Sequence, residues 1–323
     1  MIKCNGGDFM PSTITHAYIG LDTLNKLNDK PKQIIKKNLD NYKIYCQSMD
    51  VLYFYHLLLL VNNKVIDMGH LFHNEKTLAV FKQLINDNKE NQDLELFTFI
   101  SGLITHYIAD STIHPYINSL SFNKNKTIKF NSHFEVETYI DNYFIRERMH
   151  LDQKKYNNTR FIFNYTEKKI IKEELNKLYQ NIFNYSNMGK KYYRALKEMK
   201  FVYNYIRYDK YGIKKKIYQI IDLNPIKSIP KVRYLSYHFD LDNNEYYLNL
   251  NHQKWFHPDN QSIISNKSFL DLYSDVINKA SDIINKLYDY IFLNKNIDLD
   301  QLIKNNSYSN GLPLSPDQKD SNS

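Results

Sequence analysis

The chain has few of the residues that make tight turns and cross-links. Its 323 residues include only 8 glycines, 8 prolines and 2 cysteines, Cys4 and Cys46. All-β proteins spend many glycines and prolines on turns, so this scarcity argues against a sandwich or a barrel. Two cysteines allow one disulfide but no disulfide framework, so the redox compartment stays open.

Long apolar runs are also missing. The longest, residues 51–61, has about half of the ~20 residues that a membrane-spanning helix needs, and it contains His56. The N-terminal sequence lacks the apolar core of roughly 7–15 residues that marks a secretory signal. We therefore expect a soluble cytoplasmic protein, or an extracellular one only if the N-terminus given is a processed or altered form.

Apolar residues instead recur with a helical period along most of the chain. The spacing predicts helices over 75–87, 94–110, 133–149, 167–185 and 268–292. The last begins with Ser268 and Asp271 at capping-box spacing. Residues 228–262 are mixed in character and are expected to be partly extended. The predicted fold class is all-α, with one compact multi-helix domain at 10–305, an N-terminal extension at 1–9 and a polar, mobile tail at 306–323.

Histidines and carboxylates interrupt the apolar helices at a regular spacing. His106 and Asp110 are four residues apart, as are His133 and Glu137, so each pair shares one helix face. His114 follows Asp110 by four more residues and is expected at the helix end, before a proline. A lone histidine on an apolar face is usually a satisfied core residue, but two such pairs favour a metal site. Imidazole and carboxylate suit Zn²⁺, and the lack of cysteine favours a site with open coordination positions.

Five short motifs resemble, in order, those of the zinc-dependent phospholipase C family, α-helical bacterial enzymes with a three-zinc site between helices. The motifs are PSTITHAYIG with His16, CQSMDVLYFY with Asp50, GHLFHNEKT with His70 and His73, HYIADSTIHP with His106, Asp110 and His114, and HFEVE with His133 and Glu137. The resemblance covers residues 11–141, and the helical remainder fits the family loosely.

The resemblance implies two to three Zn²⁺ ions. By position, one ion takes His73, His106 and Asp110; a second takes His114, His133 and Glu137; a third takes His16 and shares Asp110. Asp50 matches the acid that holds the attacking water or acts as general base. At GHLFHNEKT we prefer His73, which leaves His70 and His56 as residues behind the ligands or as alternative ligands.

The chain departs from the family at its N-terminus. In secreted members a processed N-terminal residue completes the third metal site. Here nine residues precede Met10 and Pro11. The third site is therefore expected to be incomplete, differently ligated or empty. The gap between Asp110 and His114 is also slightly shorter than in the secreted enzymes.

The implied function is zinc-dependent hydrolysis of phosphodiesters, most simply release of a phosphorylated head group from phospholipid by metal-activated water. The aromatic residues Tyr53, Phe54 and Tyr55 are candidates for a head-group pocket. The basic segment from Lys190 to Lys216, in a chain of net charge +8, is a candidate for peripheral contact with an anionic membrane, for nucleic-acid binding, or simply for a solvated helix face. The alternatives are a nuclease of the same superfamily and a non-catalytic helical protein that binds metal or membrane.

Overall fold

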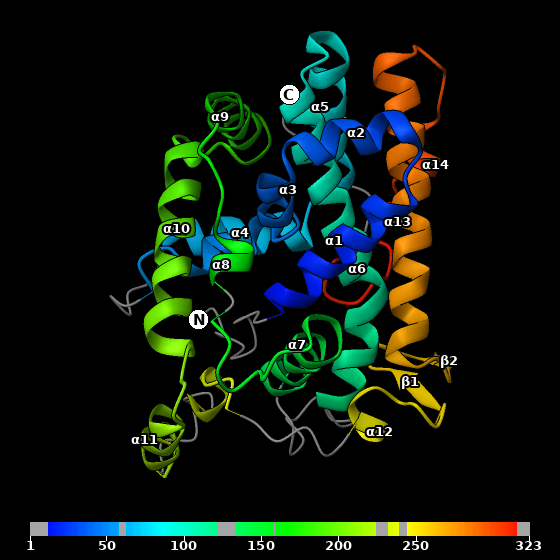
Figure 1. Cartoon of the computed structure of the whole chain (residues 1–323). Coiled ribbons are helices and arrows are strands. Elements are labelled where there is room, and N and C mark those ends of the chain that lie inside the picture. Colours follow the sequence, from blue (N-terminus) through cyan, green and yellow to red (C-terminus); the bar gives the residue numbers. More distant parts are fainter. Residues whose placement is uncertain are drawn as a thin grey trace.

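The computed structural model describes residues 12–57, 63–121, 133–157, 159–223, 232–238 and 244–314. Helices dominate these ranges, where the strands form a two-stranded antiparallel hairpin, so the all-α, single-domain prediction is confirmed (Figure 1). The elements are α1 (Thr13–Lys26), α2 (Asp29–Lys37), α3 (Leu39–Tyr45), η1 (Ser48–Phe54), α4 (Lys64–Asn74), α5 (Thr77–Asn91), α6 (Leu94–Ser121), α7 (His133–Met149), α8 (Thr159–Ile162), α9 (Lys169–Phe183), α10 (Met188–Val202), η3 (Tyr203–Arg207), α11 (Ile213–Ile221), η4 (Val232–Leu235), α12 (Asn244–Tyr247), β1 (Trp255–His257), β2 (Asn260–Ser265), α13 (Phe269–Phe292) and α14 (Leu299–Leu302).

Helix α6 is the centre of the domain. It is 28 residues long and runs through the middle of the molecule beside α13, with α1, α3 and α7 also packed on it (Figure 1). Apolar side chains surround it on all sides over most of its length, the pattern of a fully buried helix. Its hydroxyl side chains donate back to carbonyls one turn earlier, as Thr105 does to Ser101 at 2.8 Å. The histidines and carboxylate of α6 therefore lie in the interior.

A close contact between α6 and the end of α3 depends on Gly102. A Cβ atom at Gly102 would lie 2.5 Å from the Cβ of Tyr45 and 3.0 Å from the backbone nitrogen of Cys46. No larger residue fits there without moving one of the two helices. This approach brings the backbone of Cys46 beside His106, one turn further along α6.

Two of the predicted helices match the structure almost residue for residue. Helix α7 has the predicted bounds, and α13 begins one residue after the predicted cap. The capping box of α13 is confirmed, because the Ser268 hydroxyl accepts from the Asp271 backbone and the Asp271 carboxylate accepts from the Ser268 backbone. The mixed stretch 228–262 contains β1 and the beginning of β2.

The expected helix end before Pro115 is wrong. Pro115 lies inside α6, which continues to Ser121. Proline cannot donate to the carbonyl of Ser111, so the helix loses one hydrogen bond there. Tyr116 and Ile117, each 1% exposed, are buried just after it, and their burial outweighs that loss.

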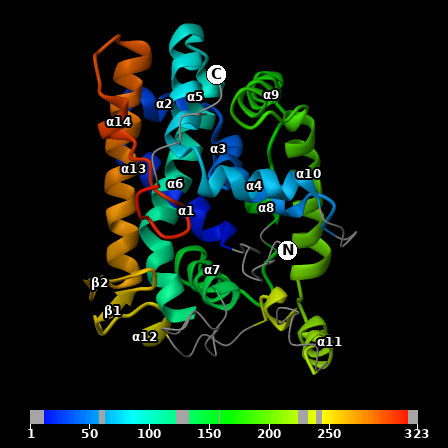
Figure 2. The same ribbon diagram turned by 180° about the vertical axis from the view of Figure 1, so that it is seen from behind.

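Residues 306–314, assigned from the sequence to a polar, mobile tail, pack on the domain in the structure. Residues 306–314 cross α6, as the red segment after α14 in Figure 2 shows. Tyr308 is 1% exposed, and its backbone nitrogen donates to the carbonyl of His73. Residues 315–323 and the predicted extension 1–9, including Cys4, lie outside the described residues. Among the described helices, none combines the length and apolar character needed to cross a bilayer.

Candidate metal centre

The eight side chains that the family resemblance implies as ligands or general base meet between five elements. They are His16 on α1, Asp50 on η1, His73 on α4, His106, Asp110 and His114 on α6, and His133 and Glu137 on α7. Within the described ranges they include two groups whose ligand atoms lie within 4.8 Å of one another. All are buried except His133, which is nearly so. The helices thus bring residues far apart in the sequence to one interior site.

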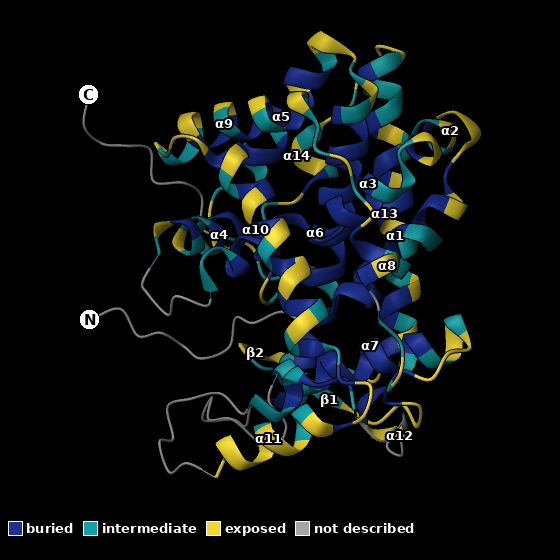
Figure 3. Ribbon diagram, turned by 60° about the vertical axis from the view of Figure 1, so that its left-hand side comes forward, coloured by how far each residue is buried: buried dark blue, intermediate teal, exposed yellow. Residues whose placement is uncertain are grey.

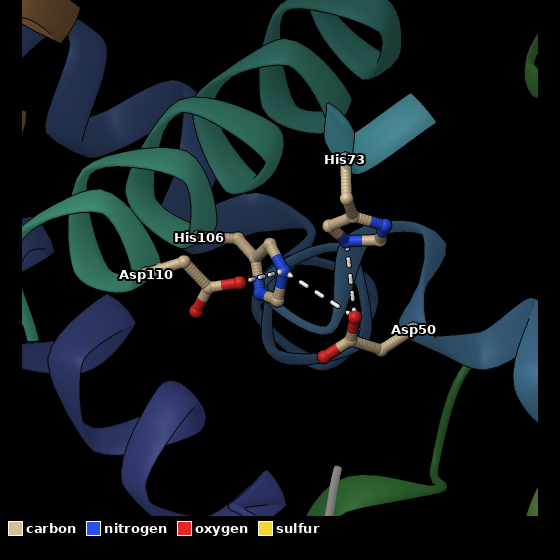
Figure 4. Close-up of side chains that lie close together, drawn as sticks. All are labelled: Asp50, His73, His106 and Asp110. Carbon is tan, nitrogen blue, oxygen red and sulfur yellow. Dashed lines mark ion pairs between the residues drawn. The ribbon is translucent and has the colours of Figure 1, made fainter. Parts of the chain in front are cut away.

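The first group contains Asp50, His73, His106 and Asp110 (Figure 4). Oδ1 of Asp50 lies 3.0 Å from Nε2 of His73 and 3.7 Å from Nε2 of His106. Oδ2 of Asp110 lies 3.1 Å from the same His106 nitrogen. The family resemblance implies that Asp50 holds the attacking water or acts as general base. Its carboxylate nevertheless lies about as close to the histidine nitrogens as that of the ligand candidate Asp110 does.

The second group contains His114, His133 and Glu137. Oε1 of Glu137 lies 3.0 Å from Nε2 of His133 and 3.6 Å from Nε2 of His114. Asp110 joins the two groups, because its Oδ1 lies 3.7 Å from Nε2 of His114. The same oxygen lies 3.4 Å from Nε2 of His16, so Asp110 also reaches the residue predicted for a third ion.

The donor atoms fit zinc by distance. Zn²⁺ binds imidazole nitrogen and carboxylate oxygen at about 2.0–2.2 Å, so neighbouring ligand atoms around a tetrahedral ion are about 3.3 Å apart. The closest nitrogen–oxygen distances in each group, 3.0 and 3.1 Å in the first and 3.0 Å in the second, are near this value.

The donor atoms also lack other partners. Several of them are fully buried without a well-directed hydrogen bond to any described group: Oδ1 of Asp50, both oxygens of Asp110, Oε2 of Glu137, and Nε2 of His73, His106 and His133. Buried polar atoms without partners are costly, and a bound cation satisfies them.

The far side of four imidazoles is held by a hydrogen bond. Nδ1 of each pairs with an oxygen, and a proton on Nδ1 leaves Nε2 unprotonated toward the centre, as a metal ligand requires. The partners are the carbonyls of Gly69 for His73 at 2.7 Å, Cys46 for His106 at 3.1 Å and Tyr308 for His114 at 3.0 Å, and the side-chain oxygen of Asn118 for His133 at 2.8 Å. Sequence reasoning missed all four partners. Three are backbone carbonyls, which leave no residue-specific signal, and Asn118 lies 15 residues before His133 on a different helix.

In the metal-free protein, the buried carboxylates favour a proton on His114, one of the candidate metal ligands. Burial lowers the pKa of His114, but Asp110 and Glu137 outweigh it and raise that pKa to about 9. Burial raises the pKa of Glu137, but His133 and His114 outweigh it and lower that pKa to about 2. Burial and the neighbouring His106 lower the pKa of His16 to about 4, so His16 is neutral at pH 7. Metal binding must therefore displace protons from the site.

His16 is positioned by Asp141, a residue that sequence reasoning missed. Asp141 lies one turn after Glu137 on α7, and its Oδ1 accepts from the backbone nitrogen of Thr15 at 2.9 Å and from the Thr15 hydroxyl at 2.8 Å. Its Oδ2 accepts from the backbone nitrogen of Ile14 at 3.4 Å. Helix α1 has no side-chain cap from its own N-cap residue, so α7 caps it from outside. One helix thus carries Glu137 and also fixes the helix that carries His16.

The structure separates His73 from the other histidines considered near it. The His70 ring lies against the Tyr53 ring, with centroids 4.9 Å apart, and belongs to neither group. His56 lies at a partly exposed turn, with its backbone nitrogen bonded to Glu198 of α10. His56 therefore lies outside both groups of candidate ligands.

The three aromatic residues after Asp50 have different neighbours. The Tyr53 hydroxyl lies 3.3 Å from Nδ1 of His73. Phe54 is a core residue packed on Tyr203. The Tyr55 ring lies under the guanidinium of Arg194. Of the three, Tyr53 contacts a ligand candidate, and the head-group pocket stays a prediction.

An all-α domain with two buried imidazole–carboxylate groups at zinc-ligand spacing defines a helical zinc protein. The chain belongs to the zinc-dependent phospholipase C family, whose model matches residues 15–200, more than half of its length. The match spans all eight site residues. No curated protein and no solved structure matches the chain. The family is zinc-dependent and two groups fit the ion, so the prediction of Zn²⁺ is supported at two sites.

Proposed function

We propose that the chain hydrolyses phospholipid as a phospholipase C does, releasing a phosphorylated head group and diacylglycerol. The observation that carries the proposal is that Asp110 joins the two groups of zinc-ligating side chains into one centre. A phosphodiester carries negative charge on its nonbridging oxygens, and clustered cations are suited to that charge.

The reaction is the addition of water across a phosphorus–oxygen bond. The water oxygen attacks phosphorus, the bond to the glycerol oxygen breaks, and a proton passes to the departing diacylglycerol. Bound Zn²⁺ lowers the pKa of water from ~15.7 towards ~7 and neutralises charge on the phosphate. Asp50 is the proposed group that orients the water or takes its proton, and His16 with Asp110 supplies two donors toward a third ion.

Zinc content tests the metal assignment. We expect the purified protein to hold at least two zinc ions per chain. His106→Ala and Glu137→Ala each remove one donor and should lose zinc together with activity. His70→Ala is the matched control, because it removes an imidazole that lies outside both groups. A fully folded protein that is active without metal would refute the assignment.

A substrate comparison tests the reaction. Release of phosphorylated head group from phospholipid is measured beside release of nucleotides from single-stranded nucleic acid, with wild type and His106→Ala. Head-group release that depends on His106 supports the proposal. Nucleotide release alone would make the chain a nuclease, and zinc binding without either product would make it a non-catalytic metal protein.

A further inference from the structure

Helix α11 leaves its apolar residues in solvent. None of its nine residues is buried. Ile213, Ile217, Ile220 and Ile221 are 59%, 50%, 68% and 48% exposed. Much of α11 is accordingly coloured as exposed in Figure 3. Isolated exposed isoleucines are ordinary, but four on one short helix are not.

These isoleucines form one stripe. At about 100° per residue, positions 213, 217, 220 and 221 fall within about 100° of the helix circumference. Exposed Lys216 lies at one edge of that arc. Lys214 lies at the other edge, but its ammonium donates to the carbonyls of Tyr205 and Tyr208. The opposite face holds the helix to the protein, since the Tyr218 hydroxyl donates to the carbonyl of Ile206 at 3.0 Å. The outward face is therefore apolar, with exposed Lys216 at its edge.

Exposed apolar side chains also flank α11 in the sequence. Tyr205, Tyr211 and Leu223 are all largely exposed, and Phe201 at the end of α10 is nearly half exposed. We call these four residues and the four isoleucines the α11 patch. Exposed Lys210 lies beside it in the sequence, and its ammonium lies 5.2 Å from the centre of the Tyr211 ring. The ammonium of Lys200 instead donates to the carbonyl of Phe163.

Two carboxylates near the patch, those of Asp209 and Asp222, already have partners within the protein. The Asp209 carboxylate accepts from the backbone of Lys214 and Lys215. The Asp222 carboxylate pairs with Arg233 at 2.6 Å. A second copy of the patch would therefore bring lysines against lysines, whereas an anionic lipid surface complements both the charge and the apolar stripe.

Helix α11 lies in the same half of the molecule as α7 (Figures 1 and 2). The short helix η4 packs on both α11 and α7. The carbonyl of Tyr234 in η4 accepts a hydrogen bond from the hydroxyl of Thr138 at 3.5 Å. Thr138 directly follows Glu137 on α7. His133, at the start of α7, has the most exposed side chain of the eight site residues. A surface that holds α11 would thus lie near the α7 end of the metal centre.

We propose that the α11 patch docks the protein on anionic phospholipid bilayers, with the isoleucine stripe in the interface and the lysines at the headgroups. The proposal rests on the proposed phospholipase function, because it supplies the surface on which the substrate lies. The membrane contact is thereby assigned to one face of α11 and not to the whole basic segment from Lys190 to Lys216.

Vesicle binding tests the proposal independently of turnover. Co-sedimentation is measured with vesicles of phosphatidylcholine alone and of phosphatidylcholine with phosphatidylserine. Ile217→Ser/Ile220→Ser should weaken binding about thirtyfold, which corresponds to about 2 kcal/mol. Lys210→Glu/Lys216→Glu should weaken binding to the anionic vesicles only. The matched control is Ile263→Ser/Ile264→Ser, which changes two isoleucines of β2 that are 41% and 50% exposed.

Three measurements on the same samples separate the outcomes. Hydrolysis of a short-chain monomeric phospholipid should be unchanged in the α11 variants, which distinguishes loss of docking from loss of the active site. Equal loss of vesicle binding in the β2 control, or full binding by the Ile217→Ser/Ile220→Ser variant, would overturn the proposal. A wild-type dimer that becomes monomeric in that variant would assign the patch to self-association. If no phosphodiester is hydrolysed but binding behaves as expected, the proposed function fails while docking stands.

Discussion

Replacement of Asp141 should destabilise the protein and disturb His16 together. Asp141→Ala leaves the backbone N–H groups of Ile14 and Thr15 buried without acceptors, and each such group costs about 1–3 kcal/mol. The hydroxyls of Thr15 and Tyr237 also lose an acceptor, but they are free to rotate and are not counted. We expect the free energy of unfolding to fall by about 3 kcal/mol.

Two variants sharpen this prediction. The amide of Asp141→Asn keeps one acceptor oxygen for Thr15 but turns an NH2 group toward the backbone N–H of Ile14, so it should cost about 1–2 kcal/mol, roughly half as much as alanine. Asp22→Ala removes a partly exposed carboxylate on α1 that pairs with Arg148, and should cost about 1 kcal/mol or less. Urea unfolding of the four proteins, wild type included, measures these differences. An alanine variant of Asp141 as stable as the asparagine variant would refute the reasoning.

The functional consequence of Asp141 is tested by a double variant. If Asp141 acts through His16, adding Asp141→Ala to His16→Ala should lower hydrolysis little further, because the second change acts on an imidazole already removed. Independent, multiplicative losses would show that Asp141 has another role.

Three further outcomes follow from particular contacts. The pKa of His114 is raised to about 9, so protonated His114 stabilises the folded protein fully below pH 6.5, and this stabilisation is lost as the pH rises through about 9. The urea midpoint of the metal-free protein should therefore fall between pH 7 and pH 9.5. A midpoint that does not change over this range would contradict the prediction. Gly311→Ala places a Cβ 2.1 Å from the carbonyl oxygen of Ser111 at a φ of +68°, so it should lower the melting temperature and make residues 306–314 more accessible to protease, which limited proteolysis would detect. Ser268→Ala removes the capping box with Asp271 and should cost about 1 kcal/mol in urea unfolding, whereas an unchanged midpoint would count against the cap.

Features that depend on residues close together in the sequence were predicted correctly. The bounds of α7 and the capping box of α13 follow from periodicity and from side chains three residues apart. The spacing of His106 and Asp110, and of His133 and Glu137, correctly placed each pair on one helix face, where both now meet. Local geometry determines these features, so they can be predicted without a fold.

Features that depend on the packing of distant segments were not predictable. Asp141 accepts from Thr15, 126 residues away, and its place after Glu137 resembles any polar position on a helix. Pro115 normally ends a helix, and only the burial of the following turn shows why this one continues. Tyr308 lies in a polar segment without periodicity, yet its carbonyl holds His114. Each of these needs the tertiary structure, because the partner is absent from the local sequence.

The charge of the centre depends on what occupies it. Asp50, Asp110 and Glu137 bring three carboxylates to one buried site, and the pKa of His114 shows that the metal-free protein offsets part of this charge with protons. Two divalent ions in place of those protons leave the centre with a net charge of about +1. An anionic phosphodiester is therefore repelled by the metal-free site and attracted by the loaded one. Inorganic phosphate should accordingly bind the zinc-loaded protein and not the chelated one, and calorimetric titration of both forms checks this; equal binding would mean that the carboxylates do not set the charge of the site.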